Sequence, residues 1–140
     1  MKIALLQIDP IVGDIAGNAV LIAEAVARAR AAGADLAVTP ELALVGYLPR
    51  DLLLSQNFVS QSWLALERLA RDLAEGPPTL VGLPEPNPSD EGRPLFNSAA
   101  LLRGGRVEQT FRKALLPTYD VFDEDRYFEP YHGAQVVDVT

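Results

Sequence analysis

The sequence predicts an α/β (α+β) domain with a mixed β-sheet and helices on one face. Short apolar runs typical of buried strands alternate with two amphipathic helical stretches in the first part of the chain. A Gly-Gly turn signal then separates two further strand-like runs, which predicts an antiparallel hairpin. With 140 residues, 49% of them hydrophobic, the chain is long enough and apolar enough to bury one core.

The beginning of the chain predicts a β-α-β unit. The apolar run over residues 2–8 is a first strand, and Asp9-Pro10 ends it. A helix follows to about residue 32, with Asn18 as its expected N-cap and Gly33 as its C′ residue. Residues 35–39 (DLAVT) form a second strand, and the crossover is expected to be parallel and right-handed. The apolar face of this helix comprises Ile22, Val26 and Ala29.

A second helix is expected over residues 58–73, because apolar residues recur there at alternating spacings of four and three. Gly76-Pro77-Pro78 ends it, and residues 79–83 form a third strand. The polar, Pro-rich segment 84–94 is expected to be a surface loop. The core-facing stripe of the helix comprises Val59, Trp63, Leu66, Ala70 and Leu73.

The second half of the chain predicts antiparallel structure. Residues 97–102 and 106–111 flank Arg103-Gly104-Gly105, a hairpin signal. A long loop with several aromatic residues follows over residues 116–133, and loops of that length typically carry function or cover something. Residues 135–139 are expected to start another strand.

Composition excludes several classes of protein. The net charge of −7 disfavours nucleic acid and anionic membranes as partners. Without cysteine, these residues contain no disulfide, no Cys-ligated zinc and no thiol nucleophile, and the one histidine, His132, cannot build a multi-histidine metal site. No apolar run reaches the roughly 18 residues of a membrane span, and no signal peptide is recognisable, so we expect a cytoplasmic protein and no metal site in this chain.

Glu41 is the first candidate for chemistry. It lies in the otherwise apolar run AVTPELALVGYLPRDLL, directly after a predicted strand, where sites gather in open α/β sheets. An ionised carboxylate is costly to bury without a partner. The structural alternative is that Glu41 caps a turn or pairs with an arginine.

Lys113 and Glu124 are the other two candidates. Lys113 is one of two lysines, against ten arginines, and ends the strand RVEQTFRK. A compact ammonium beside a reacting atom is a role that favours Lys over Arg, although a solvated strand end remains the alternative. Glu124 lies in the acidic segment VFDEDRYFEP, which is otherwise interpreted as a solvated face or a weak cation site.

Three motifs resemble the nitrilase (carbon-nitrogen hydrolase) superfamily: KIALLQIDP, AGADLAVTPELALVGY and FRKALLP. Three others, VGDIAGN, GYLPRDLLL and LPTYDVFDEDRYFEP, look more narrowly like the glutamine amidotransferase domain that begins glutamine-dependent NAD synthetases. The resemblance covers essentially the whole chain. Thr39, Val45, Leu48 and Asp120 depart from residues that are common in that family.

The resemblance implies roles for the candidate residues. In such enzymes a cysteine attacks the carboxamide carbon, and by motif Glu41 is the general base, Lys113 the oxyanion partner and Glu124 the second carboxylate. Tyr119 and Phe122 are implied to line the substrate pocket. The implied fold is an α-β-β-α sandwich, of which residues 1–140 are roughly the first half. The family's cysteine would follow the next strand, so we expect an N-terminal, truncated part of the domain without a nucleophile.

The resemblance also implies partners. The parent would hydrolyse glutamine and pass ammonia to a C-terminal synthetase domain, absent here, which would convert deamido-NAD to NAD with ATP and magnesium. Another carbon-nitrogen hydrolase, such as an ω-amidase or carbamoylase, is the alternative, and a non-catalytic half-sandwich that serves binding is a third. We expect a homo-oligomer, because half a sandwich leaves sheet edges and an apolar face uncovered.

A geometric prediction follows for Glu41 and Lys113. Each follows a strand end, and neighbouring parallel strands present those ends at one rim of a sheet. A base and an oxyanion donor must reach the same carbon, each at roughly 3 Å. We therefore expect the two side chains to lie within about twice that distance of each other.

Overall fold

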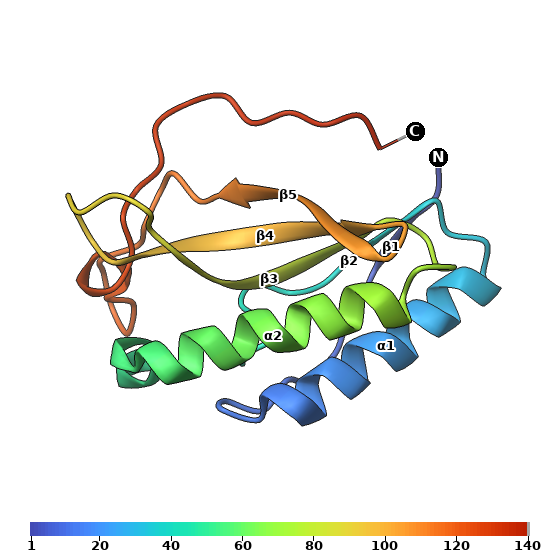
Figure 1. The fold of residues 1–140 in the computed structure, drawn as a ribbon, viewed down its shortest axis with the longest axis horizontal. Helices are drawn as coiled ribbons and strands as arrows, with labels where there is room; N and C mark the ends of the chain where they lie inside the picture. The colour runs from blue at the N-terminus through green and yellow to red at the C-terminus, as the bar shows by residue number, and fades with distance from the viewer. Residues whose placement is uncertain (140) are drawn as a thin grey trace.

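The computed structural model describes residues 1–139 and contains a five-stranded mixed sheet with two long helices packed on one face (Figure 1). The strand order follows the chain, with parallel pairing from β1 to β3 and antiparallel pairing from β3 to β5. This confirms the mixed sheet with helices on one face. The strands are β1 (Ile3–Leu5), β2 (Leu36–Val38), β3 (Thr79–Pro86), β4 (Leu95–Arg103) and β5 (Arg106–Arg112).

The helices begin and end close to the predicted positions. They are α1 (Ile15–Ala31) and α2 (Gln56–Asp72), with two short 3₁₀ helices, η1 (Arg50–Leu54) and η2 (Glu124–Arg126). Gly33 follows α1 with a φ of 71°, and the N–H of Ala34 reaches back to the carbonyl of Ala29, so Gly33 is the C′ residue of a left-handed cap as expected.

The core lies between the helices and the sheet. Ile22, Val26 and Ala29 of α1 are buried as predicted, and they pack with the central strands. In α2 the predicted stripe also faces inward: Val59, Leu66 and Ala70 are buried, whereas Trp63 and Leu73 pack against the core while partly exposed. Each fully buried leucine contributes about 1.5–3 kcal/mol, so this face largely determines where the helices lie.

Asn18 is not the N-cap of α1, contrary to the prediction. Asp14 is the cap, and its carboxylate accepts the N–H of Gly17 at 2.9 Å. Asn18 lies one turn inside the helix, fully buried, and its amide bonds the N–H and carbonyl of Ile11 and the carbonyl of Leu44. The sequence pattern failed here because either residue type can cap a helix, and only the folded chain places buried main-chain groups beside Asn18.

Two predicted boundaries also differ. β3 continues through Pro84 to Pro86, so the Pro-rich loop begins later than expected, because β4 pairs with β3 along its whole length. Residues 135–139 form no strand. Instead, the side-chain amide of Gln135 bonds both the N–H and the carbonyl of Arg112, so a side chain occupies a pairing site on the β5 edge.

The hairpin is confirmed. β4 and β5 pair antiparallel around Gly104 and Gly105, whose φ values of 56° and 82° favour glycine. Because β4 reverses the direction, β5 runs parallel to β2 and β3. The carboxyl ends of β2, β3 and β5 and the amino end of β4 therefore lie at one rim of the sheet, where the functional candidates are found.

Candidate active site

The Glu41 loop crosses over β3 rather than continuing beyond β2. A Cβ atom added to Gly82 of β3 would lie 2.5 Å from the nitrogen of Leu42 and 2.8 Å from the carbonyl oxygen of Pro40. The loop is also tied to β3 by the N–H of Gly82, which donates to the Thr39 hydroxyl at 3.1 Å. The missing side chain of Gly82 thus allows Glu41 to reach β4 and beyond.

This crossing corrects the physical basis of the proximity prediction. β2 and β5 are not neighbours in the sheet, because β3 and β4 separate them. The shared rim brings Glu41 and Lys113 to the same end of the sheet, but the remaining gap is closed by the loop. Leu42, buried with a φ of 51°, makes the sharp turn that follows Glu41.

Lys113 directly follows β5 and donates to both glutamates. Its Nζ lies 2.7 Å from Oε1 of Glu41, and 3.2 and 3.1 Å from Oε1 and Oε2 of Glu124. The main chain of Lys113 is held as well, because its N–H donates to the carbonyl of Asn97 at 2.8 Å. The structure therefore brings the three predicted residues, Glu41, Lys113 and Glu124, into one cluster.

Glu124 enters the cluster from η2, in the middle of the long aromatic loop. Its side chain is only 3% exposed. The loop is folded back onto the domain by Phe128, which is buried against Leu42 and forms a bridge with Leu95 of β4. The 116–133 segment thus brings a buried carboxylate next to Lys113, and whether this long loop has a function stays a prediction.

The arginine next to Lys113 belongs to a second polar network. Arg112 donates two hydrogen bonds to Oε1 of Glu85, at 2.6 and 3.1 Å, and its guanidinium lies 4.2 Å from the ring centre of Phe96. The hydroxyl of Ser98 donates to the other oxygen of Glu85 at 2.6 Å. These contacts hold the end of β5 and so help to fix the position from which Lys113 extends.

The electrostatics of the cluster follow from burial and charge. Burial raises the pKa of Glu124, and the negative charge of Glu41 raises it further. Together these effects outweigh the hydrogen bond from Lys113, which lowers the pKa. Burial lowers the pKa of Lys113, but its hydrogen bonds to the two carboxylates outweigh burial and leave that pKa raised. Lys113 therefore stays charged at neutral pH, while Glu124 is easier to protonate than an exposed glutamate.

Two residues of the site were missed by sequence reasoning. The Asn97 amide donates to Oε1 of Glu41 at 2.6 Å and to Oε2 of Glu124 at 3.4 Å. The Tyr47 hydroxyl donates to Oε1 of Glu124 at 3.4 Å, and burial followed by the charges of Glu124 and Glu41 raises the pKa of Tyr47 to about 12. An asparagine inside an apolar strand was a signal for the first, whereas nothing local distinguishes Tyr47.

Tyr119 and Phe122 lie beside the cluster rather than within it. Tyr119 is 71% exposed, and its ring packs edge-on against Phe122 at 5.7 Å between centres. Phe122 in turn lies 6.3 Å from the ring of Tyr47. Neither residue is among those that line the cleft at Glu41 and Lys113 in the part of the chain that the structure describes. Their role in substrate binding stays a prediction.

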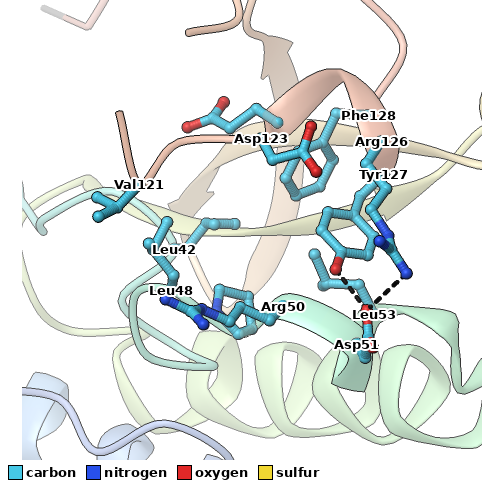
Figure 2. Close-up of a pocket in the computed structure, with 12 residues that line it drawn as sticks. Leu42, Leu48, Arg50, Asp51, Leu53, Val121, Asp123, Arg126, Tyr127 and Phe128 are labelled. Carbon is cyan, nitrogen blue, oxygen red and sulfur yellow. Dashed lines mark hydrogen bonds and ion pairs between the residues drawn. The ribbon is translucent and has the colours of Figure 1, made fainter. Parts of the chain in front are cut away.

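Two cavities meet the cluster from different sides. A cleft of about 330 Å³ opens beside Glu41, Asn97 and Lys113, and its apolar floor includes Leu80 and Phe111. A second cavity of about 310 Å³ has Glu124 in its wall and lies between η1 and the 121–128 segment. Figure 2 shows the residues that line this second cavity, among them Asp51, which is bonded to Tyr127 and Arg126. The Glu41–Lys113 pair thus faces the cleft on the sheet.

Within residues 1–139, no group of three or more His, Cys, Asp or Glu side chains is arranged to hold a metal ion. None of the helices there has the length and apolar character needed to cross a membrane.

The sequence matches the family model described as carbon-nitrogen hydrolase over residues 2–140. The chain therefore belongs to the carbon-nitrogen hydrolase family. Over 129 residues it is 50% identical to the glutamine-dependent NAD(+) synthetase of Synechocystis sp., a match that covers 90% of this chain and 23% of that protein. Over 140 residues it is 37% identical to the Thermotoga maritima protein of the same name, covering 99% of this chain and 23% of that protein.

Solved structures give the same relationship. The glutamine-dependent NAD+ synthetase of Acinetobacter baumannii, in complex with ADP, superposes with a TM-score of 0.82 at 34% identity, covering 98% of this chain and 25% of that one. An amidase of the nitrilase superfamily from Nesterenkonia, carrying a Cys-to-Ala substitution, superposes with a TM-score of 0.76 at 30% identity, covering 95% of this chain and 49% of that one. The chain spans about a quarter of the NAD synthetases and about half of the amidase.

Proposed function

We propose that this chain supplies the glutamate and lysine residues of a glutamine amidotransferase site, and that the protein which contains it makes ammonia for NAD synthesis. The observation that carries the proposal is the Lys113 ammonium bonded to Glu41 and Glu124 at the rim of the sheet. The similarity to glutamine-dependent NAD synthetases supports glutamine as the amide and deamido-NAD as the acceptor of ammonia. ATP and magnesium would act in the synthetase part, since the Acinetobacter baumannii relative binds ADP.

The cluster has the groups that amide hydrolysis needs. Glu41 takes the proton of a cysteine thiol, and the sulfur attacks the carboxamide carbon as the C=O bond becomes a C–O⁻ bond. The Lys113 ammonium stabilises that oxyanion. Glu41 then returns the proton to the departing ammonia, which leaves a thioester that water hydrolyses to glutamate. Glu124 keeps Lys113 charged and in place.

The nucleophile would come from outside these 140 residues, which contain no cysteine. One of the similar Nesterenkonia structures shows the acetamide moiety of fluoroacetamide added to the active-site cysteine of that amidase. The hydroxyls that line the cleft are engaged elsewhere, because Thr39 donates to the carbonyl of Pro40 and Ser98 donates to Glu85. The isolated chain is therefore expected to release no ammonia from glutamine, and release above that of its Glu41→Ala variant would contradict this.

The experiment that tests the proposal measures ammonia release from glutamine by the intact protein. Glu41→Gln and Lys113→Met should each lower kcat by roughly a hundredfold or more, because each removes a group that acts in the transition state. Glu75→Gln and Lys2→Met are matched controls on residues that are not among those lining the cleft, and they should leave kcat unchanged. Full activity in the Glu41 variant would rule out the assigned base.

The amidase similarity favours one alternative, another carbon-nitrogen hydrolase that acts on simple amides. The same assay distinguishes the two functions if acetamide and propionamide are offered beside glutamine. Preference for glutamine, with ammonia passed to deamido-NAD, supports the amidotransferase. Preference for a simple amide supports the alternative. An ω-amidase or a carbamoylase would be recognised in the same way, by preference for its own substrate over glutamine. A half-sandwich that only binds would release no ammonia from any of them.

A further inference from the structure

Asn97 contacts all three members of the cluster. It lies near the amino end of β4, and it is only 4% exposed. Its side-chain amide donates to both carboxylates, at 2.6 Å to Glu41 and 3.4 Å to Glu124. Its main-chain carbonyl accepts the N–H of Lys113 at 2.8 Å. One buried residue therefore links the two loops and the end of β5.

The hydrogen bonds to Glu41 are unevenly distributed. Lys113 at 2.7 Å and Asn97 at 2.6 Å both donate to Oε1. A carboxylate oxygen has two in-plane lone pairs, and two short donors use both of them. Within residues 1–139, no hydrogen bond of Glu41 goes to Oε2, and the side chain is 41% exposed. The two oxygens of this carboxylate are thus chemically distinct.

We propose that Asn97 is a positioning residue for the base: with Lys113 it occupies Oε1 of Glu41 and leaves Oε2 as the oxygen that accepts the proton of the nucleophile. The inference rests on the proposed function, because it assigns the proton-accepting atom of that site. Asn97 itself touches no reacting atom and acts through Glu41.

The side-chain type agrees with this role. Glu41 and Glu124 share a single ammonium, so the cluster carries a net negative charge when both are ionised. A neutral amide donates to both carboxylates without neutralising the base, whereas a second lysine would pair with Glu41 and an aspartate would add repulsion. The amide orientation is determined by the same environment, because a flipped side chain would turn its carbonyl toward two carboxylates.

The kinetic test uses the intact protein and two substitutions. Asn97→Leu removes the donor while keeping the branched shape of the side chain, and it should lower kcat by about tenfold to a hundredfold with KM within about twofold, since the base is misplaced but substrate contacts remain. Asn97→Asp preserves the shape and should regain activity as the pH falls, because the introduced carboxyl group, once protonated, again donates to Glu41. Thr79→Val is the matched control: it removes a buried hydroxyl that bonds main chain only, at the opposite end of β3, and it should lower the Tm while leaving kcat unchanged.

A second readout does not depend on hydrolysis. Carbon-13 titration of the glutamate side chains, with signals assigned by Glu41→Gln and Glu124→Gln, should show the Glu124 carboxyl titrating at higher pH in Asn97→Leu than in the wild type, because the Asn97 hydrogen bond lowers the pKa of Glu124. An unchanged titration in both Asn97 variants, or a pH profile of kcat that does not differ between Leu and Asp at this position, overturns the inference. If the wild type releases no ammonia from glutamine, the proposed function fails, and the titration still decides whether Asn97 orients the carboxylates.

Discussion

The ammonium of Lys113 lies 2.7 Å from the carboxylate of Glu41, although 72 residues separate them in the chain. The distance confirms the expectation that both side chains meet at one rim of the sheet. The same ammonium also bonds Glu124, so one cation serves two carboxylates of different exposure. The stability of this site therefore depends on Lys113 more than on either acid.

Replacing Lys113 by methionine should destabilise the fold by about 1–3 kcal/mol at neutral pH. The substitution leaves the buried Glu124 beside Glu41 without a cation, but the partial exposure of Glu41 limits the loss. Urea denaturation gives the free energy of unfolding. Lys2→Met, which removes the other lysine, should cost less, and an equal loss in both variants would show that the cluster contributes no special stability.

The pH dependence of stability should change when Glu124 becomes glutamine. The pKa of Glu124 in the fold is raised above its ordinary value of 4.5, so the folded state holds this proton at a pH where the unfolded chain has released it. The stability that protonated Glu124 contributes is complete at pH values below 4.5, and it is lost as the pH rises through the pKa of Glu124 in the folded state. Denaturation at a series of pH values from acid to neutral should show a flatter profile in Glu124→Gln. A profile parallel to that of the wild type would contradict the raised pKa.

Gly82→Ala should displace the Glu41 loop. The new Cβ would lie within 3 Å of main-chain atoms of Leu42 and Pro40, which cannot move as a flexible side chain would. We expect a loss of about 1–3 kcal/mol, typical of overpacking, and a longer distance between Glu41 and Lys113. Calorimetry and a crystal structure of the variant measure the two effects. Gly104→Asn is the control, because nothing lies within 4 Å there and asparagine tolerates a positive φ.

The sheet face opposite the helices should make the 140-residue chain associate. Ile3 and Leu5 of β1 are 51% and 74% exposed, and the floor of the cleft continues this apolar face across β3 to β5. Sedimentation should detect oligomers, and Leu5→Lys should shift them toward monomer. Leu54→Lys changes an exposed leucine on η1, away from this face, and it should leave the oligomers unchanged. A monomeric wild type that also fails to bind a hydrophobic dye would contradict the prediction.

Local patterns were sufficient wherever neighbours in sequence decide the structure. The apolar stripe of α2 and the Gly104-Gly105 turn each depend on residues within a few positions, and both were predicted with nearly correct bounds. Asn18 and Gln135 could not be placed in this way. Their amides bond main-chain groups of distant segments, and a polar side chain does not indicate in advance which buried group it will satisfy.

The sequence by itself determined the family and the mixed sheet, and it marked Glu41, Lys113 and Glu124 as candidates, because these follow from motifs and strand ends that are contiguous in the chain. Only the tertiary structure decided that the three side chains share hydrogen bonds and that Asn97 joins them. That geometry depends on a loop passing over Gly82 and on another folding back through Phe128. The physical reason is that the distances within a cluster of charges are set by long-range packing, whereas sequence spacing constrains only which rim of the sheet a residue can reach.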